Sequence, residues 1–267
     1  MTAARFEGYE AIRFERLGAV LRITIDHPAS ERNTVDALLH GELGRLMAEL
    51  RDEADARAVV LTAAGPIFSA GGDFASFREL RSIEALEELR RHARRMLADL
   101  LDIEVPVVAA VNGAAVGLGA SLALLCDVVV AADTATFVDP HVRVGLVAGD
   151  GGTVAWPAAL GPARAKWHLL SGEPLAATDA AALGLITRCV PAAELVATAL
   201  AMAEQLAGKP PLAVRYTKAA LNQPLKRALM ETVDVAIPLE LVTFLSADHA
   251  EAVQAAIEKR PGTYEGR

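Results

Sequence analysis

His141 and Asp150 stand nine residues apart and are the residues best suited to acid–base chemistry. Histidine titrates near neutral pH and is the commonest general base, and a neighbouring carboxylate orients the imidazole and raises its basicity. We therefore predict an acid–base pair in which Asp150 orients His141. Two structural alternatives stay open: a loop role for His141, and capping by Asp150 of a helix beginning near Gly152 or Thr153. For Asp139, two residues before His141, a turn role is favoured.

Two Gly/Ala-rich turns, Phe68–Asp73 and Val111–Gly119, are typical of a site for a negatively charged oxygen. Each follows a strand-like run and precedes a helix-like run, so its backbone N–H groups are free to face a ligand. The N–H of Leu118 lies in the first turn of a predicted helix, where donors are unpaired and the helix dipole is positive. Gly72 stands similarly ahead of Asp73, which we expect to cap a helix over 74–81. The turns thus predict an oxyanion hole formed by Gly72 and Leu118, and their other substrate-contacting residues are Ala70, Gly71 and Gly117.

Two other interpretations of the second turn fit less well. A dinucleotide-binding loop needs a third glycine where the chain has Leu122, and it needs the first strand of its unit. A nucleophile elbow needs a glycine where the chain has Ala123, and it places the serine at a sharp turn, whereas Ser121 falls inside the predicted helix. Ser121 is therefore interpreted as a small residue lining the substrate site.

Composition excludes several classes of protein. The net charge of −8 disfavours nucleic acid as a partner, because phosphate binding needs a basic face. No apolar run reaches the roughly 18–20 residues that span a bilayer, and the first residues lack the apolar core of a signal peptide. Cys126 and Cys189 have no metal-like spacing and fit buried reduced thiols. We expect a cytoplasmic protein with no metal site and no membrane or nucleic-acid partner.

The order of elements predicts an α/β fold with a helical C-terminal region. Strands and helices alternate up to about residue 150, which implies crossover connections and a largely parallel sheet. The expected strands are Ala11–Glu15, Val20–Ile25, Ala58–Thr62, Val107–Val111, Asp127–Ala131 and Leu185–Val190. The main expected helices are Val35–Glu53 with Asn33 or Thr34 as N-cap, Ile83–Leu101, Leu118–Leu125, Ala192–Leu206, Leu212–Gln223, Leu225–Ser246 and Asp248–Lys259. This pattern predicts a core over residues 1–195 and a helical oligomerisation region over residues 196–267.

The two turns and their surroundings resemble the enoyl-CoA hydratase/isomerase (crotonase) superfamily nearly end to end. The resemblance rests on FSAGGD at 68–73, PVVAAVNGAAVGLG at 106–119, Cys126-Asp127, ALGLI at 182–186, and the C-terminal Lys259-Arg260-Pro261 with Tyr264-Glu265-Gly266. It implies a ββα spiral core, a helical trimerisation region, and a homotrimer or dimer of trimers. It also implies an acyl-CoA substrate whose carbonyl is held by the N–H groups of Gly72 and Leu118. Coenzyme A would be part of the substrate and no separate cofactor is expected; Lys259, or a cation in the helix of Lys218, would meet its phosphates.

The chain departs from the hydratases of this family at two positions. Those enzymes use two glutamates to place and deprotonate water, and the matching positions here hold Ser121 and His141. The His141/Asp150 pair is instead similar to that of the 6-oxocamphor hydrolase-like branch, which cleaves a C–C bond of β-diketones without coenzyme A. Glu240 falls where that branch has a functional glutamate, and we include it among the substrate-contacting residues. The branch's further pocket histidine would fall at Leu118, so the chain departs from it too.

The sequence thus leaves three hypotheses. The first is an enzyme of the hydratase/isomerase type that acts on an acyl-CoA thioester, with His141 and Asp150 as its acid–base pair. The second is a hydrolase that cleaves a cyclic β-diketone by retro-Claisen chemistry. The third is a non-catalytic member that binds CoA esters.

Overall fold

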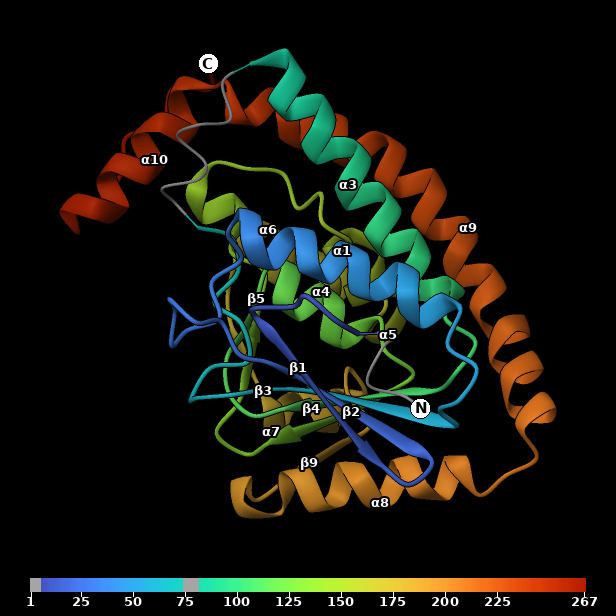
Figure 1. Cartoon of the computed structure of the whole chain (residues 1–267). Coiled ribbons are helices and arrows are strands. Elements are labelled where there is room, and N and C mark those ends of the chain that lie inside the picture. Colours follow the sequence, from blue (N-terminus) through green and yellow to red (C-terminus); the bar gives the residue numbers. More distant parts are fainter. Residues whose placement is uncertain (1–5, 74–81) are drawn as a thin grey trace.

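A six-stranded sheet forms the centre of the computed structural model, which describes residues 6–73 and 82–267 (Figure 1). Its strand order is β1-β2-β3-β4-β6-β9, and every neighbouring pair is parallel except the β1–β2 hairpin. The strands are β1 (Ile12–Leu17), β2 (Val20–Ile25), β3 (Ala58–Ala63), β4 (Val107–Val111), β6 (Val128–Ala132) and β9 (Arg188–Val190). The central strands β3 and β4 are buried along their whole length, as expected for apolar runs that are covered on both faces. The predicted α/β core is therefore present, and only its last strand is shorter than expected.

A second, small sheet carries segments that matter for the site. It consists of β5 (Ala115–Val116), β7 (Thr136–Val138) and β8 (Leu175–Ala176) in the order β5-β7-β8. The β5–β7 pair is parallel, so the residues that follow both strands emerge at the same edge. None of these strands was predicted, because two or three residues are too few for an alternation of apolar and polar side chains to be recognised.

Helices cover both sides of the main sheet (Figure 1). In Figure 1, α8 lies below the sheet and contacts β3, β4 and β6. On the other side of the sheet, α1 packs against α3, and α3 packs against α9. The helices are α1 (Ala37–Arg51), α3 (Ile83–Asp102), α4 (Leu118–Leu124), α5 (Gly152–Leu160), α6 (Pro162–Ser171), α7 (Ala177–Leu183), α8 (Leu195–Ala207), α9 (Pro211–Phe244) and α10 (Ala247–Glu258), with short 3-10 turns η1 (His141–Val144) and η2 (Ala192–Glu194).

The start of α1 differs from the prediction. Its N-cap is Asp36, whose carboxylate accepts a hydrogen bond from the N–H of Leu39 at 3.0 Å, and neither Asn33 nor Thr34 caps the helix. Asn33 instead has a left-handed backbone (φ 47°) and a buried amide that bonds three backbone groups, those of His27, Ala64 and Ile67. Asn33 therefore ties together the loops after β2 and β3. The helix over 74–81 that Asp73 was expected to cap falls on residues outside the described ranges.

The two predicted helices around residue 224 form one helix. Pro224 and Pro238 both lie inside the 34 residues of α9, although proline removes a hydrogen bond from the helix interior. Tertiary contacts hold the helix across these points: Lys226 pairs with Asp102 at 2.5 Å and Asp234 with Arg94 at 2.6 Å, both joining α9 to α3. Packing against α3 thus overrides the local break.

An ion pair made by a buried lysine anchors the first half of α9 to the sheet. Lys218 is only 8 % exposed; its Nζ lies 2.6 Å from Oδ2 of Asp127 and donates to the carbonyl of Val105 at 2.9 Å. The same Asp127 oxygen accepts the N–H of Val107 at 2.7 Å. Lys218 is thus fully engaged within the fold and is not free to meet a phosphate.

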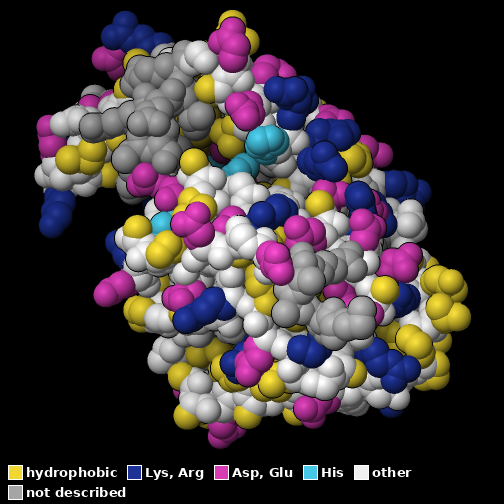
Figure 2. Space-filling model, viewed as in Figure 1, with side chains coloured by type: hydrophobic (Ala, Val, Ile, Leu, Met, Phe, Trp, Pro, Cys, Tyr) yellow, Lys and Arg dark blue, Asp and Glu magenta, His cyan; other side chains and the backbone are white. Residues whose placement is uncertain are grey.

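Acidic and basic side chains are interspersed over the face shown in Figure 2. The arginines of α3 follow this pattern: Arg90 pairs with Glu87 along the helix, and Arg94 with Asp234 of α9. The exposed side of α3 therefore carries arginines held in ion pairs. Within the described part of the chain, no helix combines the length and apolarity required to cross a membrane.

Replacing Lys218 with Met should lower the free energy of unfolding by about 2 kcal/mol, because the Asp127 carboxylate and the carbonyl of Val105 would both lose the buried ammonium group that they share. Lys226→Met on the same helix is the matched control. Its ion pair with Asp102 is more exposed, so the expected loss is about 1 kcal/mol or less. Urea unfolding at fixed protein concentration measures both values, and equal losses would contradict the anchoring role of Lys218.

Candidate functional site

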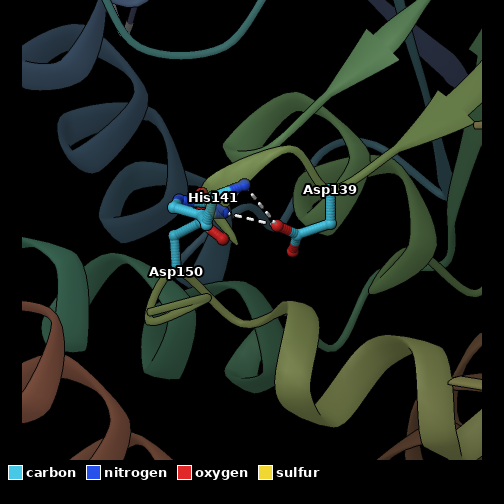
Figure 3. A group of neighbouring side chains, drawn as sticks. All are labelled: Asp139, His141 and Asp150. Carbon is cyan, nitrogen blue, oxygen red and sulfur yellow. Dashed lines mark hydrogen bonds and ion pairs between the residues drawn. The ribbon is translucent and has the colours of Figure 1, made fainter. Parts of the chain in front are cut away.

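His141 lies at the edge where β5 and β7 end. It begins the 3-10 turn η1, three residues after the last residue of β7. Its ring Nδ1 lies 2.5 Å from Oδ1 of Asp139, and its backbone N–H donates to the same oxygen at 3.3 Å (Figure 3). Asp139 is 1 % exposed, so a buried carboxylate supports one side of the imidazole.

Two further carboxylates face the other ring nitrogen. Nε2 of His141 lies 3.5 Å from Oδ2 of Asp150 and 3.6 Å from Oε1 of Glu240. Figure 3 shows Asp150 and Asp139 on different sides of the imidazole. Asp150 comes from the loop before α5, and Glu240 comes from α9, so three separate segments meet at this nitrogen. Asp150 does not cap α5: the N-cap residue is Gly151, without a side-chain hydrogen bond.

Ser121 holds Asp150 in place. It is completely buried in α4, and its hydroxyl donates to Oδ1 of Asp150 at 3.2 Å. This bond leaves Oδ2 of Asp150 turned toward the imidazole. Ser121 is thus part of the His141 group, whereas the sequence analysis predicted only that it lines the substrate site.

Gly149 and Gly152 leave the space that two charged side chains occupy, and Gly117 lies beside His141 and Asp150. A Cβ at Gly149 would lie 2.0 Å from Oε2 of Glu240, and a Cβ at Gly152 would lie 2.1 Å from Oδ2 of Asp139. A Cβ at Gly117 would lie 3.5 Å from Cε1 of His141 and 3.7 Å from Oδ2 of Asp150, and Gly117 also has a left-handed backbone (φ 53°) that favours glycine. The charged side chains of the site therefore pack directly against glycine backbone.

Burial and mutual repulsion shift the titration of these groups. Burial raises the pKa of Glu240 to about 8 and that of Asp150 to about 6. Burial alone would lower the pKa of His141, but the charges of Asp150, Asp139 and Glu240 raise it well above its ordinary 6.5. Three carboxylates around one imidazole carry more negative charge than an imidazolium can balance. The group therefore retains protons that isolated side chains would have lost.

The two glycine turns are joined to each other and lie next to the His141 group. Ser69 forms a parallel bridge with Ala115 of β5, in which the N–H of Ser69 donates to Ala114 and the N–H of Val116 donates to Ser69. Directly after β5, the N–H of Gly117 donates to the carbonyl of Val138 at 2.9 Å. One short strand therefore connects the first glycine turn, the second glycine turn and the segment that leads to His141.

The other predicted substrate-contacting residues lie in different surroundings. Gly71 is buried with φ 75°, and a Cβ there would lie 2.9 Å from the carbonyl oxygen of Val116; Ala70 is half-buried, and its N–H donates to Arg32. Lys259 is the exposed C-cap of α10, and no hydrogen bond or ion pair within the described ranges joins it to His141. Glu240 and Ser121 thus join His141 and Asp150 directly, whereas Lys259 does not.

Asp139, His141 and Asp150 place one possible ligand atom each within 4.8 Å of one another. Because Nδ1 is already in contact with Asp139, a cation would have to bind His141 through Nε2, beside Asp150 and Glu240.

The sequence analysis favoured a turn role for Asp139 and missed its contact with His141. The available signal was its position two residues before His141 at the end of a short strand, and the strand itself was not recognised.

Known proteins resemble the chain along almost its whole length. The family model described as enoyl-CoA hydratase/isomerase matches residues 15–267. A probable enoyl-CoA hydratase of Rhodobacter capsulatus is 37% identical over 97% of this chain and 99% of its own length. The carnitinyl-CoA dehydratase of Citrobacter koseri is 32% identical, with the same shares covered.

Two solved structures share the fold closely. An enoyl-CoA hydratase/isomerase from Mycobacterium paratuberculosis superimposes with a TM-score of 0.87 at 40% identity, covering 91% of this chain and 97% of that one. A β-diketone hydrolase from the cyanobacterium Anabaena sp. PCC 7120, bound to (S)-3-oxocyclohexyl acetic acid, gives a TM-score of 0.85 at 33% identity, covering 90% and 96%. The α/β architecture, the glycine turns and these matches together show that the chain belongs to the enoyl-CoA hydratase/isomerase (crotonase) family.

Proposed function

We propose that the protein is an enzyme that acts on an acyl-CoA thioester, in which backbone N–H groups stabilise the enolate or oxyanion while His141 and Asp150 transfer the proton. The observation that carries this proposal is the position of Gly117 beside the pair: a Cβ built on Gly117 would lie 3.5 Å from Cε1 of His141 and 3.7 Å from Oδ2 of Asp150. Leu118, whose N–H is one of the two proposed donors, is the next residue. The thioester is taken from the CoA esters that the names of the relatives specify.

The backbone geometry supports the two proposed donors. Gly72 forms a parallel bridge with Val35 in which the hydrogen bonds are made by Gly71 and Asp73, so the N–H of Gly72 itself faces the opposite side. Leu118 is the first residue of α4, and its N–H has no acceptor within the helix. The loss of one such donor typically costs about 2.7–4 kcal/mol of transition-state stabilisation.

Asp150 would take the part of the missing hydratase glutamate. Position 121 holds a serine, and Asp150 lies within hydrogen-bond distance of its hydroxyl. A longer acidic side chain at position 121 would compete for the same space and add a further negative charge. The pair of glutamates is thereby replaced by an aspartate from the loop before α5 and a histidine from η1.

The protonation of the pair suggests how it works. With a pKa well above 6.5, His141 is mainly an imidazolium at neutral pH, while Asp150, with a pKa of about 6, is mainly ionised. Such a pair donates a proton through Nε2 of His141 and accepts one through Oδ2 of Asp150. Because the two groups interact strongly, the proton belongs to the pair rather than to either residue.

Hydrolysis of a C–C bond in a cyclic β-diketone is the second candidate function. It is favoured by the absence of both hydratase glutamates, by Glu240 beside Nε2 of His141, and by the similarity to the Anabaena β-diketone hydrolase. In this reaction the pair would activate water for attack on a carbonyl held in the same oxyanion hole.

Turnover of crotonyl-CoA beside a panel of cyclic β-diketones separates the two candidates. We expect activity toward the CoA ester, and a loss of about 10³-fold in kcat for His141→Ala, because the proton-transfer group is removed. His92→Ala, an exposed histidine on α3, is the control and should keep full activity. Turnover of diketones alone would favour the second candidate. If no substrate reacts but CoA esters raise the melting temperature, the non-catalytic hypothesis is supported.

The pH profile should have two limbs. We expect kcat/KM to fall below about pH 6, where Asp150 takes up a proton, and to fall again well above pH 6.5, where His141 loses its proton. Asp150→Asn should lower kcat/KM by about 10²-fold or more and remove the acid limb from the residual activity. A wild-type profile that rises through pH 6.5 to an alkaline plateau would instead indicate a simple histidine base.

We also propose that the chain assembles as a homotrimer or dimer of trimers through the outer face of α9. Three apolar side chains follow one another at helical spacing on this face: Val235, Leu239 and Val242, which are 58%, 51% and 65% exposed. Exposing this apolar surface to water is unfavourable, and a neighbouring subunit packed on it would remove that exposure.

Val235→Arg should therefore reduce the assembled mass, as measured by light scattering after size-exclusion chromatography. Val196→Arg, on α8 across the sheet, should leave the mass unchanged. A wild-type monomer, or no difference between the variants, would contradict this interface.

A further inference from the structure

We propose that Asp139 is the positioning residue of the site: it fixes the tautomer and ring orientation of His141, so that Nε2 is the nitrogen that meets the reacting atoms. This inference rests on the proposed function only in assigning proton transfer to His141. It gives a defined task to a carboxylate that the sequence placed in a turn.

Asp139 makes the short contacts to His141. One oxygen, Oδ1, lies 2.5 Å from Nδ1 and accepts the backbone N–H of the same residue at 3.3 Å. A carboxylate is an acceptor, so Nδ1 must carry the hydrogen of this bond. In the neutral imidazole Nε2 then holds the lone pair, and in the imidazolium Nε2 holds the second proton. In both states the nitrogen that faces Asp150 and Glu240 performs the transfer.

Asp150 is poorly placed for the same task. Its Oδ2 is 3.5 Å from Nε2, beyond a normal hydrogen bond, and its Oδ1 accepts the hydroxyl of Ser121. The two aspartates therefore stand on different nitrogens of one ring. Removing Asp150 should impair proton transfer, whereas removing Asp139 should release the ring.

The fold holds Asp139 in one position. The residue follows β7 directly, and Pro140 restricts the backbone that precedes it. Its Oδ2 occupies space next to Gly152, since a Cβ at Gly152 would lie only 2.1 Å from this oxygen. Gly152 is the first residue of α5, and the dipole at this end of the helix favours a negative charge. Oδ2 accepts no hydrogen bond from the described residues, so the bonds that Asp139 accepts from these residues all come from His141.

Asp139→Asn tests the proposal in the full-length protein. The amide keeps the size of the carboxylate but can turn its NH₂ group toward Nδ1 and so favour the opposite tautomer. We expect kcat to fall by about 10²-fold or more with KM changed less than about threefold, because the wrong tautomer impairs proton transfer and leaves the binding groups in place. The corresponding aspartate-to-asparagine change in serine proteases lowers kcat by about 10⁴-fold for the same reason. Circular dichroism establishes that the variant is folded.

Nitrogen NMR of the protein with ¹⁵N-labelled histidine side chains provides a readout that is independent of turnover. The chain has 6 histidines, and comparison with His141→Ala identifies the ring of interest. At a pH where the imidazole is neutral, the wild-type ring should carry its proton on Nδ1, and Asp139→Asn should move it to Nε2 or produce a mixture. Gly152→Ala should act in the same direction without removing a charge, because its methyl group displaces Oδ2 of Asp139.

The pair of His27 and Asp36 offers a matched control. Nε2 of His27 lies 3.0 Å from Oδ2 of Asp36, and Asp36→Asn retains a good N-cap for α1. This variant should leave kcat and the His141 signals unchanged. If folded Asp139→Asn keeps the wild-type tautomer and a kcat within about twofold, Asp139 is a turn residue and the proposal is overturned. If the wild type acts on no substrate, the proposed function fails, while the NMR comparison still decides the role of Asp139.

Discussion

The arrangement of the site depends on the parallel pairing of two very short strands, β5 and β7. Only two residue pairs are in register, Ala115 with Phe137 and Val116 with Val138, and the N–H of Gly117 extends the pairing to Val138. Because parallel strands end at the same edge, Leu118 and His141 emerge side by side from distant parts of the chain. The bridge from Ser69 to Ala115 adds the first glycine turn to the same edge. A displaced β5 would move the proposed oxyanion donors and the imidazole together.

The lack of a side chain at Gly149 and Gly152 is the second constraint on the site. The stretch from Gly149 to Gly152 looks in the sequence like a flexible glycine loop around one aspartate. In the structure Gly149 accommodates Glu240, and Gly152 accommodates Asp139. These close approaches allow three carboxylates to gather around one histidine with little exposure to water. The glycines therefore define the electrostatics of the site as much as the charged residues do.

The sequence predicts the long, regular parts of this fold well and the short, context-dependent parts poorly. Strands such as Val107–Val111 and helices such as α3 have apolar patterns that extend over many residues, and their positions were close to correct. The strands β5 and β7 have too few residues for any pattern, and packing against α3 carries α9 through Pro224, where local propensity predicts a break. The same limit applies to the site, since the proximity of Asp139 to Nδ1 is decided by a strand of three residues.

Charge balance gives the site its chemical character. In the hydratases of the family, two glutamates act on water, so both functional groups are acids of one kind. Here one of the two positions holds an imidazole between carboxylates: burial and the neighbouring negative charges raise the pKa of Glu240, and the carboxylates raise the pKa of His141. In the proposed function, such a group would both supply and accept protons near neutral pH, and the negative charge that develops on the substrate oxygen would be stabilised by the backbone N–H groups instead. The proposed separation of the anion site from the proton-transfer group would allow the family's fold to keep one oxyanion hole while the acid–base residues, and with them the reaction, change.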